Sequence, residues 1–386
     1  MIFYGRQSIS QADINAVVDV LASDYLTQGK AVTGFEEALG AYFGAKHVCA
    51  VSNGTAALHL IGIALGWQAD DLIICPSLTF VATANSIVYS GATPVFVDIC
   101  PVSYTLDPNQ VEDRINKLRS NGKRVAALIG VDYAGHPCDW QALRWLADKY
   151  DLQLVNDNCH AMGASYGDSK MYAVEFADAV AQSYHPVKHI TTGEGGAILT
   201  NSSDLYEKVK KLRTHGITKN SDQGQNGESW VYRMDELGFN YRITDFQSAL
   251  GISQLKRLDI FIKRRREIAS RYDLELSQID HLEIPQESAD VTHAYHIYPL
   301  KLNFDRLKCS KAGLFRNLKG KGVALQVHYI PVHTQPYYQE RFFTEDSSLE
   351  NTLRFYEQEV SLPLYPDLEL QSQELVLEEL LKHVSL

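Results

Sequence analysis

Residues 179–201 read AVAQSYHPVKHITTGEGGAILTN, two apolar strand-like runs on either side of a Gly-rich turn. Lys188 lies in this turn, and Ser183 precedes it by five residues. A lone lysine in a Gly-rich turn is most often a surface residue, but a solvated charge is unusual between two apolar strands. The position is natural for a lysine that forms a Schiff base. The stretch therefore indicates an α/β sheet with a reactive lysine at the end of a strand.

The alternation of strand and helix extends over residues 50–215. Further strand-like runs cover residues 72–77, 93–99, 125–133 and 152–157, and helix-like stretches lie between most of them. Short strands separated by helices are typical of a mostly parallel sheet that is covered on both faces. We therefore expect a large α/β domain that binds its ligand at the ends of its strands.

The rest of the chain predicts a second, smaller α/β domain. The sequence predicts one long helix over residues 245–275, which leaves the large domain. It predicts a strand of the small domain over residues 324–331 (ALQVHYIP). We expect a large domain with an N-terminal segment over residues 1–245. The linking helix and the small C-terminal domain are expected over residues 246–386.

Composition narrows the classes of function. The 386 residues include 36 Lys and Arg against 47 Asp and Glu, a net charge of −11, which disfavours a nucleic-acid binder. The basic run 263–266 reads as the solvated face of a helix. No apolar run reaches about 18 residues, so we expect no membrane span. The start, MIFYGRQSISQAD, lacks the basic and apolar regions of a signal peptide.

Cysteines and histidines form no metal-binding or disulfide pattern. The six cysteines are scattered and include no C-x-x-C pair, which suits the reducing cytoplasm. His328 and His333 are five residues apart, a poor spacing for metal ligands on a strand. The sequence also lacks the G-x-G-x-x-G and G-x-x-x-x-G-K-[ST] motifs. We therefore expect a cytoplasmic protein with no metal site, no nicotinamide-type Rossmann site and no P-loop.

Three further polar segments lie at predicted element ends. Residues 52–57 (SNGTAA) open an apolar helix with a small turn, which suits a phosphate but also fits an ordinary capped helix. Asp157 follows a buried strand, where an acid is costly unless it pairs with a cation or serves in a turn. Residues 238–242 (GFNYR) precede the long helix and also read as a linking turn. Together with Lys188 and the aromatic Phe80, they fit pyridoxal 5′-phosphate (PLP).

These segments carry a resemblance to a known family. The chain resembles the DegT/DnrJ family of nucleotide-sugar aminotransferases, and the motifs follow the family's order over nearly the whole chain. The resemblance implies the aspartate aminotransferase-like fold (PLP fold type I), an α/β fold with a mostly parallel central sheet and a smaller C-terminal α/β domain. It implies PLP, with its aminated form PMP, as the cofactor. The matching motifs are SNGTAALHL (52–60), PSLTFVATAN (76–85), GATPVFVD (91–98), SYHPVKHITTGEGGAILT (183–200) and LGFNYRITDFQSALG (237–251).

Finer features resemble one branch of this family. They are YGRQSISQADINAVVDVL (4–21), DYLTQGKAV (24–32) and VHYIPVHTQPYY (327–338). That branch aminates UDP-linked 4-keto-6-deoxy-N-acetyl-hexosamines in pseudaminic acid biosynthesis. The resemblance therefore implies a UDP-sugar substrate, UDP-2-acetamido-2,6-dideoxy-β-L-arabino-hex-4-ulose, and L-glutamate as the amino donor.

The resemblance also implies a role for individual residues. Lys188 would form the Schiff base with the cofactor and shuttle the proton, and Asp157 would hold the proton of the pyridinium nitrogen. Phe80 would stack on the ring, and His160 would lie beside its phenolic oxygen. The implied phosphate ligands are Gly54, Thr55 and Ser183, with Asn240 reaching the phosphate from the neighbouring subunit of a homodimer. The implied substrate-facing residues are Thr27, Lys30, Glu194, His328 and Tyr329.

Alternatives stay open at this level. The family usually carries other residues at Asn156 and Asn158, on either side of Asp157. Some relatives have His at position 188 and act as sugar dehydratases, whereas Lys188 favours transamination here. The other readings are an aminotransferase for a different UDP- or dTDP-4-keto sugar, a PLP-dependent lyase or dehydratase, and a non-catalytic regulator with this fold. The intact Lys188, Asp157 and Ser183 speak against a regulator.

Overall fold

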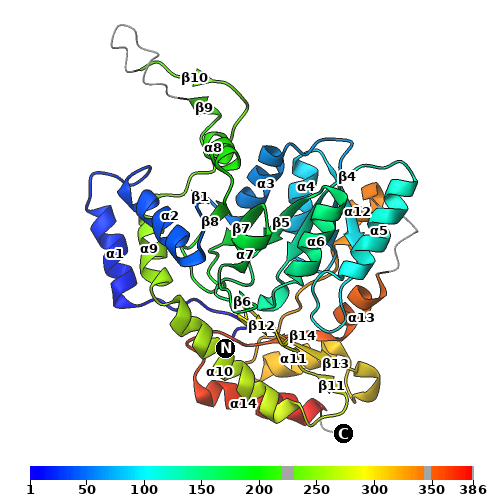
Figure 1. The fold of residues 1–386 in the computed structure, drawn as a ribbon. Helices are drawn as coiled ribbons and strands as arrows, with labels where there is room; N and C mark the ends of the chain where they lie inside the picture. Colours follow the sequence, from blue (N-terminus) through cyan, green and yellow to red (C-terminus); the bar gives the residue numbers. More distant parts are fainter. Residues whose placement is uncertain (219–229, 343–348, 385–386) are drawn as a thin grey trace.

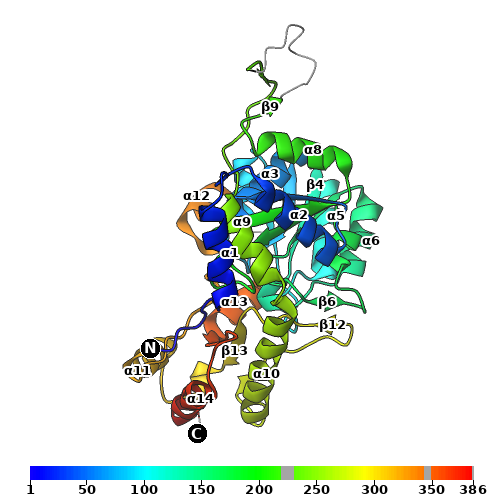
Figure 2. The ribbon, with the colours of Figure 1, turned by 90° about the vertical axis from the view of Figure 1, so that its left-hand side faces the viewer.

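The computed structural model describes residues 1–218, 230–342 and 349–384. Figure 1 shows a large α/β body around a central sheet and, below it, a smaller group of helices and strands that holds the C-terminal end. The short strands β9 (Ile217–Thr218) and β10 (Arg233–Met234) form an arm that leaves the large body on the opposite side. Figure 2 shows the same arm extending away from the molecule in the view from the side.

A seven-stranded, mostly parallel sheet organises the large body. Its order is β1-β8-β7-β5-β4-β2-β3, and β8 alone runs antiparallel to its neighbours. Parallel neighbours need a crossover between them, and helices supply it here. The strands are β1 (His47–Val51), β2 (Leu72–Pro76), β3 (Thr93–Val97), β4 (Val125–Val131), β5 (Gln153–Asp157), β7 (Ala179–Ser183) and β8 (Gly196–Thr200).

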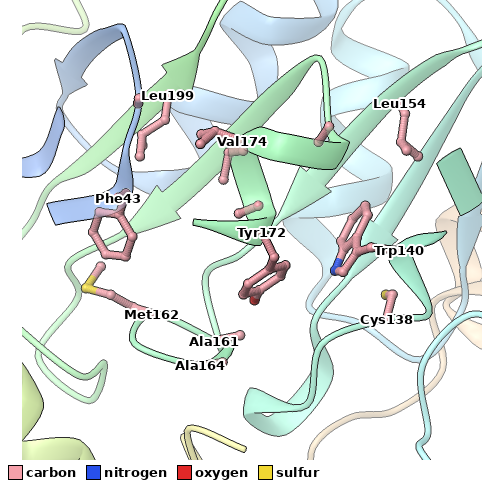
Figure 3. Packing of buried hydrophobic residues seen from close by; sticks show 14 of the residues in the cluster. Phe43, Cys138, Trp140, Leu154, Ala161, Met162, Ala164, Tyr172, Val174 and Leu199 are labelled. Atoms are coloured by element: carbon pink, nitrogen blue, oxygen red, sulfur yellow. The ribbon is translucent and has the colours of Figure 1, made fainter. Parts of the chain in front are cut away.

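Successive strand side chains point to opposite faces of this sheet and feed two separate cores. Leu128 and Val180 belong to the first core, whereas Ile129 and Ala181 belong to the second. Figure 3 shows the first core, in which Trp140, Tyr172 and Val174 pack near strand residues. Helices that contribute to the first core include α2 (Lys30–Phe43), α5 (Pro108–Ser120), α6 (Trp140–Tyr150) and α7 (Tyr172–Phe176). Helices that contribute to the second core include α3 (Gly54–Leu65), α4 (Val81–Tyr89) and α8 (Ser203–Leu212).

A third core lies beneath the large body. The strands β11 (Leu282–Glu283), β13 (Tyr298–Leu302) and β14 (Glu359–Leu362) form an antiparallel sheet in the order β11-β13-β14. Helices α10 (Leu258–Leu276), α11 (Lys311–Gly320) and α14 (Leu370–Val384) cover it, and Ile2 of the N-terminal segment packs against the same core. The other elements are α1 (Gln11–Leu21), α9 (Asp245–Leu255), α12 (Pro336–Phe342), α13 (Glu350–Gln358), β6 (Ser165–Tyr166) and β12 (Val291–Thr292), with short 3-10 turns at Tyr133–Gly135, Phe304–Arg306 and Val332–Thr334.

The single helix expected over residues 245–275 is wrong, because the structure has two helices, α9 and α10, in its place. At the junction, Arg257 binds the Asp13 carboxylate at 3.0 Å, and Gln254 donates to the same carboxylate at 2.8 Å. Asp13 also closes the capping box at the start of α1. The break therefore lies where this junction docks on the first turn of α1.

The strand expected over residues 324–331 is also wrong. This segment makes one isolated bridge, Gln326 to Ser361, and carries no regular strand. Its later residues turn toward the large body, where the backbone N–H of Val332 donates to the carbonyl of Ser77. The alternating apolar residues of this segment therefore lie on a stretch of chain that crosses between two hydrophobic cores, and they do not form a strand of a sheet.

The basic run 263–266 is not a uniformly solvated face. Lys263 is exposed, but Arg265 is completely buried. Its Nη1 donates to three backbone carbonyls, those of Tyr295, His296 and Leu364, each at 3.1 Å. Burial lowers the pKa of Arg265 to about 9. Arg265 therefore ties α10 to the two chain segments that flank β13 and β14.

No helix in residues 1–218, 230–342 and 349–384 is long and apolar enough to cross a membrane. Within the same ranges, no cluster of three or more His, Cys, Asp or Glu side chains has the arrangement of a metal site.

Candidate active site

A cavity of about 850 Å³ opens at the strand ends of the large sheet. Its wall combines the ends of β5 and β7, the first turn of α3, the Lys188 turn and the crossing segment 326–329. Ten of the residues predicted from the sequence line it, namely Gly54, Thr55, Phe80, Asp157, His160, Ser183, Lys188, Glu194, His328 and Tyr329. The structure therefore joins residues from distant parts of the chain in one place.

The other three predicted residues lie outside this cavity and are exposed. Thr27 pairs with Thr244 in an isolated bridge, and Asn240 pairs with Thr214 in another. Lys30 opens α2, whose first turn is fixed by Asp245, since Ala31 N–H donates to that carboxylate at 3.0 Å. All three stand on segments near the start of α9.

The Lys188 turn is held by its own backbone. The N–H of Lys188 donates to the carbonyl of His185, and Thr192 N–H donates to the carbonyl of Tyr184. The amine Nζ of Lys188 points into the cavity region and lies 3.4 Å from Nε2 of His296. Removal from water lowers the pKa of this amine from its ordinary value, while Cys159 and Asp157 act in the opposite direction. A lysine of this kind is an activated nucleophile.

Asp157 is the last residue of β5, and its carboxylate is almost completely buried. Oδ2 accepts a hydrogen bond of 2.7 Å from the Thr83 hydroxyl, and Oδ1 accepts one of 3.2 Å from the backbone N–H of Cys159. The Thr83 hydroxyl is itself 2.7 Å from that of Thr79. These contacts fix the carboxylate in one orientation facing the cavity.

Helix α3 begins at the cavity for a local reason. Asn53 caps it, with Oδ1 accepting from the backbone N–H of Ala56 at 2.8 Å. Gly54 follows, and a Cβ at this position would lie 2.8 Å from Cβ of Ser183. The glycine therefore keeps open the space between the helix N-terminus and Ser183, where free N–H groups and the helix dipole favour an anion.

Aromatic and imidazole rings also line the cavity. Phe80 is 54% exposed and lines the cavity, and its ring centroid lies 5.8 Å from that of Tyr329. The Tyr329 hydroxyl and Nε2 of His160 are 3.0 Å apart. Burial and the neighbouring Lys188 hold the pKa of His160 and His296 well below the usual range. Both imidazoles are therefore neutral at pH 7.

Sequence reasoning missed His296 and Thr83 as members of this site. His296 lies in HAYHIYPL, directly before β13, and its only sequence signal is a pair of histidines before an apolar strand. Thr83 is one of several small residues in the first turn of α4, and its hydroxyl gives no signal of its own. Tyr4 also lines the cavity and comes from the N-terminal segment.

Comparison with known proteins identifies the kind of site. Residues 7–381 match the DegT/DnrJ/EryC1/StrS aminotransferase family. The chain belongs to this family. The match covers both the central sheet with Lys188 and the smaller C-terminal group of elements. The aminotransferase family expected from the sequence motifs is therefore confirmed.

Individual relatives agree with this assignment over nearly their full length. A UDP-4-amino-4,6-dideoxy-N-acetyl-beta-L-altrosamine transaminase of Campylobacter jejuni is 37% identical over 376 residues, 97% of this chain and 96% of that protein. Helicobacter pylori PseC, an aminotransferase involved in the biosynthesis of pseudoaminic acid, has a TM-score of 0.89 at 33% identity and covers 98% of both chains. The α/β, PLP type I fold and the assignment as a PLP-dependent sugar aminotransferase are confirmed.

The residues around the cavity of this aminotransferase fit PLP. NtdA of Bacillus subtilis, solved with bound PMP, is 27% identical with a TM-score of 0.82, over 97% of this chain and 82% of that one. In the present structure, the Lys188 amine, the Asp157 carboxylate and the space kept open by Gly54 all face one cavity. An amine for the aldehyde, an acid for the ring nitrogen and a cradle for the phosphate are the three groups that PLP requires.

Proposed function

We propose that this aminotransferase transfers the amino group of L-glutamate to C4 of a UDP-linked 4-keto-6-deoxy-N-acetyl-hexosamine. The substrate we favour is UDP-2-acetamido-2,6-dideoxy-β-L-arabino-hex-4-ulose. The observation that carries the proposal is the convergence of Lys188, Asp157 and the α3 N-terminus on a cavity of about 850 Å³. The choice of sugar rests on the similarity to the altrosamine transaminase of Campylobacter jejuni.

PLP, when bound, supplies the electron sink that lets an amino group pass from glutamate to the sugar. Lys188 would hold the cofactor and then, as a neutral amine, carry the proton between the amino donor and the cofactor. Asp157, oriented by Thr83, would keep the ring nitrogen protonated by a charge-assisted hydrogen bond. Phe80 would stack on the ring and His160 would lie beside it, so both would position the cofactor. The proposed phosphate ligands are Gly54, Thr55 and Ser183.

The nucleotide would act as a handle for the sugar. Binding energy from a remote group orients the ketone without being part of the reacting centre. Glu194, His328 and Tyr329 line the cavity and would face the sugar or the donor. The chain has a net charge of −11, so local cations must attract the diphosphate, and Lys30 is our candidate.

A homodimer would bring the remaining predicted residues to the site. Asn240, Thr27 and Lys30 lie outside the cavity of their own chain, and we propose that they reach the cavity of a second copy. The β9–β10 arm supports an assembly, because Trp230, Tyr232 and other large apolar side chains on it are exposed. Exposed apolar side chains that gather on one projecting element mark an interaction surface.

The test is amine transfer by the holoenzyme from L-glutamate to a panel of UDP- and dTDP-4-keto sugars, with the products identified by mass spectrometry and NMR. We expect the L-configured UDP sugar to have the highest kcat/KM. A free 4-keto sugar should react far more slowly than its UDP conjugate. A preference for a dTDP-hexose, or water loss in place of amination, would overturn the proposed substrate or reaction.

A further inference from the structure

The crossing segment that carries His328 is fixed by β14 beneath the cavity. Nδ1 of His328 lies 2.7 Å from the hydroxyl of Ser361, and that hydroxyl lies 2.5 Å from Oε1 of Glu359. The backbone N–H of His328 donates to the other carboxyl oxygen of Glu359 at 3.0 Å. The Tyr133 hydroxyl donates to the His328 carbonyl. All of these groups are buried, so both the ring and the backbone of His328 are fixed in position.

The second ring nitrogen of His328, Nε2, remains available to a ligand in the cavity. His328 lines the cavity, and Nε2 forms no hydrogen bond within the described residues. Burial and the nearby Lys188 lower the pKa of His328 to about 3. The ring is therefore neutral at physiological pH and carries one proton, on Nδ1 or on Nε2.

The chain Glu359–Ser361–His328 decides which nitrogen carries that proton, because the Ser361 hydroxyl has a single hydrogen. When Glu359 is ionised, Ser361 donates to it, so Nδ1–H of His328 donates to Ser361 and Nε2 is a bare acceptor. When Glu359 is protonated, it donates to Ser361, Ser361 donates to Nδ1, and Nε2–H becomes a donor. The two states differ by one proton in total.

Glu359 titrates in a range where this change matters. Burial raises its pKa to about 8, while the hydrogen bond from Ser361, the charge of Lys311 on α11 and the N–H of His328 oppose the shift. Tyr104, Tyr133 and Tyr329 face the same region, and burial keeps their hydroxyls protonated. Lys311 is the cation whose charge opposes this shift. Lys301, the register partner of Glu359 on β13, is paired with the Glu283 carboxylate at 2.5 Å.

We propose that Glu359 and Ser361 are positioning residues that set the hydrogen-bonding polarity of His328 Nε2 toward the nucleotide sugar. The proposal rests on the proposed function, since it takes the sugar ligand as the occupant of the cavity. Ketone and diphosphate oxygens are acceptors, so the ligand binds best while Nε2 carries the proton. Raising the pH through the titration of Glu359 reverses the polarity and weakens binding.

The variants Glu359→Gln and Ser361→Ala test this. A glutamine amide mimics the protonated acid, since it donates to Ser361 and accepts from the N–H of His328, so Glu359→Gln should lock the donor state. In the wild type, KM for the UDP sugar should rise about tenfold between about pH 7 and pH 9, as the loss of one hydrogen bond predicts. In Glu359→Gln it should stay flat. The matched control is Glu350→Gln, an exposed glutamate at the start of the preceding helix α13.

A second measurement does not depend on turnover. In protein labelled with 15N-histidine, the His328 signal, assigned with a His328→Gln variant, should change from the Nε2–H to the Nδ1–H tautomer as the pH rises. Ser361→Ala should abolish this pH-linked change, and Glu359→Gln should keep the Nε2–H form throughout.

Two results would overturn the inference. One is a pH profile of KM in Glu359→Gln that matches the wild type. The other is a His328 tautomer whose dependence on pH is the same in the wild type and in both variants. A wild-type enzyme that aminates no UDP sugar would instead defeat the proposed function, and the NMR titration would still decide whether the three residues act as a relay. If Ser361→Ala fails to fold, the pH profile of KM and the NMR titration are both measured with Glu359→Gln alone.

Discussion

The hydroxyl of Thr83 donates a 2.7 Å hydrogen bond to Oδ2 of Asp157, so the first turn of α4 holds the carboxylate that ends β5. The backbone of Cys159 holds the other oxygen. With both oxygens engaged, the carboxylate cannot rotate freely and presents one fixed direction to the cavity. This arrangement makes Asp157 the group through which the protein would control the cofactor ring.

Replacing Asp157 by Asn should lower the rate of amine transfer by several orders of magnitude, because an amide cannot stabilise a protonated ring nitrogen. Thr83→Val should cost roughly tenfold, since it removes one hydrogen bond that orients the acid. Steady-state kinetics measure both effects, and thermal unfolding should show that Asp157→Asn is folded. Near-wild-type turnover of Asp157→Asn would exclude the role.

Lys188→Ala should lose turnover while still binding the cofactor through the α3 N-terminus. Burial lowers the pKa of the Lys188 amine, which favours its neutral, nucleophilic form, and the variant has no amine at this position. Borohydride reduction of the wild-type holoenzyme, followed by peptide mapping, should place the label on Lys188. Labelling of Lys30 or any other lysine would refute the assignment.

Gly54→Ala should raise the dissociation constant of PLP about tenfold. The added methyl would lie 2.8 Å from Cβ of Ser183, which is anchored to the backbone, so β7 and α3 must move apart. Titration of the apoprotein, followed by absorbance, measures the affinity. Gly320→Ala is the matched control, because a Cβ at Gly320 meets nothing within 4 Å. Equal affinity in both variants would contradict a phosphate cradle at Gly54.

A mixture of Lys188→Ala and Asn240→Asp should regain part of the activity when the two inactive variants are refolded together. Asn240 lies outside the cavity of its own chain, so a mixed dimer would contain one complete site. Activity assays before and after mixed refolding give the answer. A monomer with full cofactor occupancy and activity would rule out a shared site.

Arg265→Met should destabilise the protein by about 3 kcal/mol. The variant leaves three buried carbonyls without their donor and removes the contact between α10 and the segments flanking β13 and β14. Lys263→Met, at an exposed position two residues earlier, should change stability by less than about 0.5 kcal/mol. Urea unfolding compares the two, and equal midpoints would show that the buried guanidinium contributes nothing.

Much of the large α/β body around the central sheet could be predicted because its signals are local. Apolar runs at 72–77 and 152–157 became β2 and β5, since short apolar runs between helices fit a buried parallel strand. Asn53 and Gly54 mark the start of α3 because a cap and a small turn act within four residues. The motif around Lys188, in combination with the four other matching motifs, likewise indicated the family and its cofactor.

Contacts between segments that are far apart in the sequence decided the features that could not be predicted. The break between α9 and α10 depends on Arg257 and Asp13, which are 244 residues apart. The burial of Arg265 depends on carbonyls that the basic run itself does not reveal. His296 meets Lys188 across 108 residues, and His328 meets Ser361 across 33.

The sequence by itself therefore predicted the alternating strands and helices around the central sheet, the family and the candidate site residues, because capping, periodicity and motif spacing are properties of neighbouring residues. Only the tertiary structure decided which polar groups lose their water and which partners replace it. Burial and pairing set the pKa of Lys188, the neutrality of the histidines and the orientation of Asp157. These quantities depend on packing between segments that no local pattern encodes.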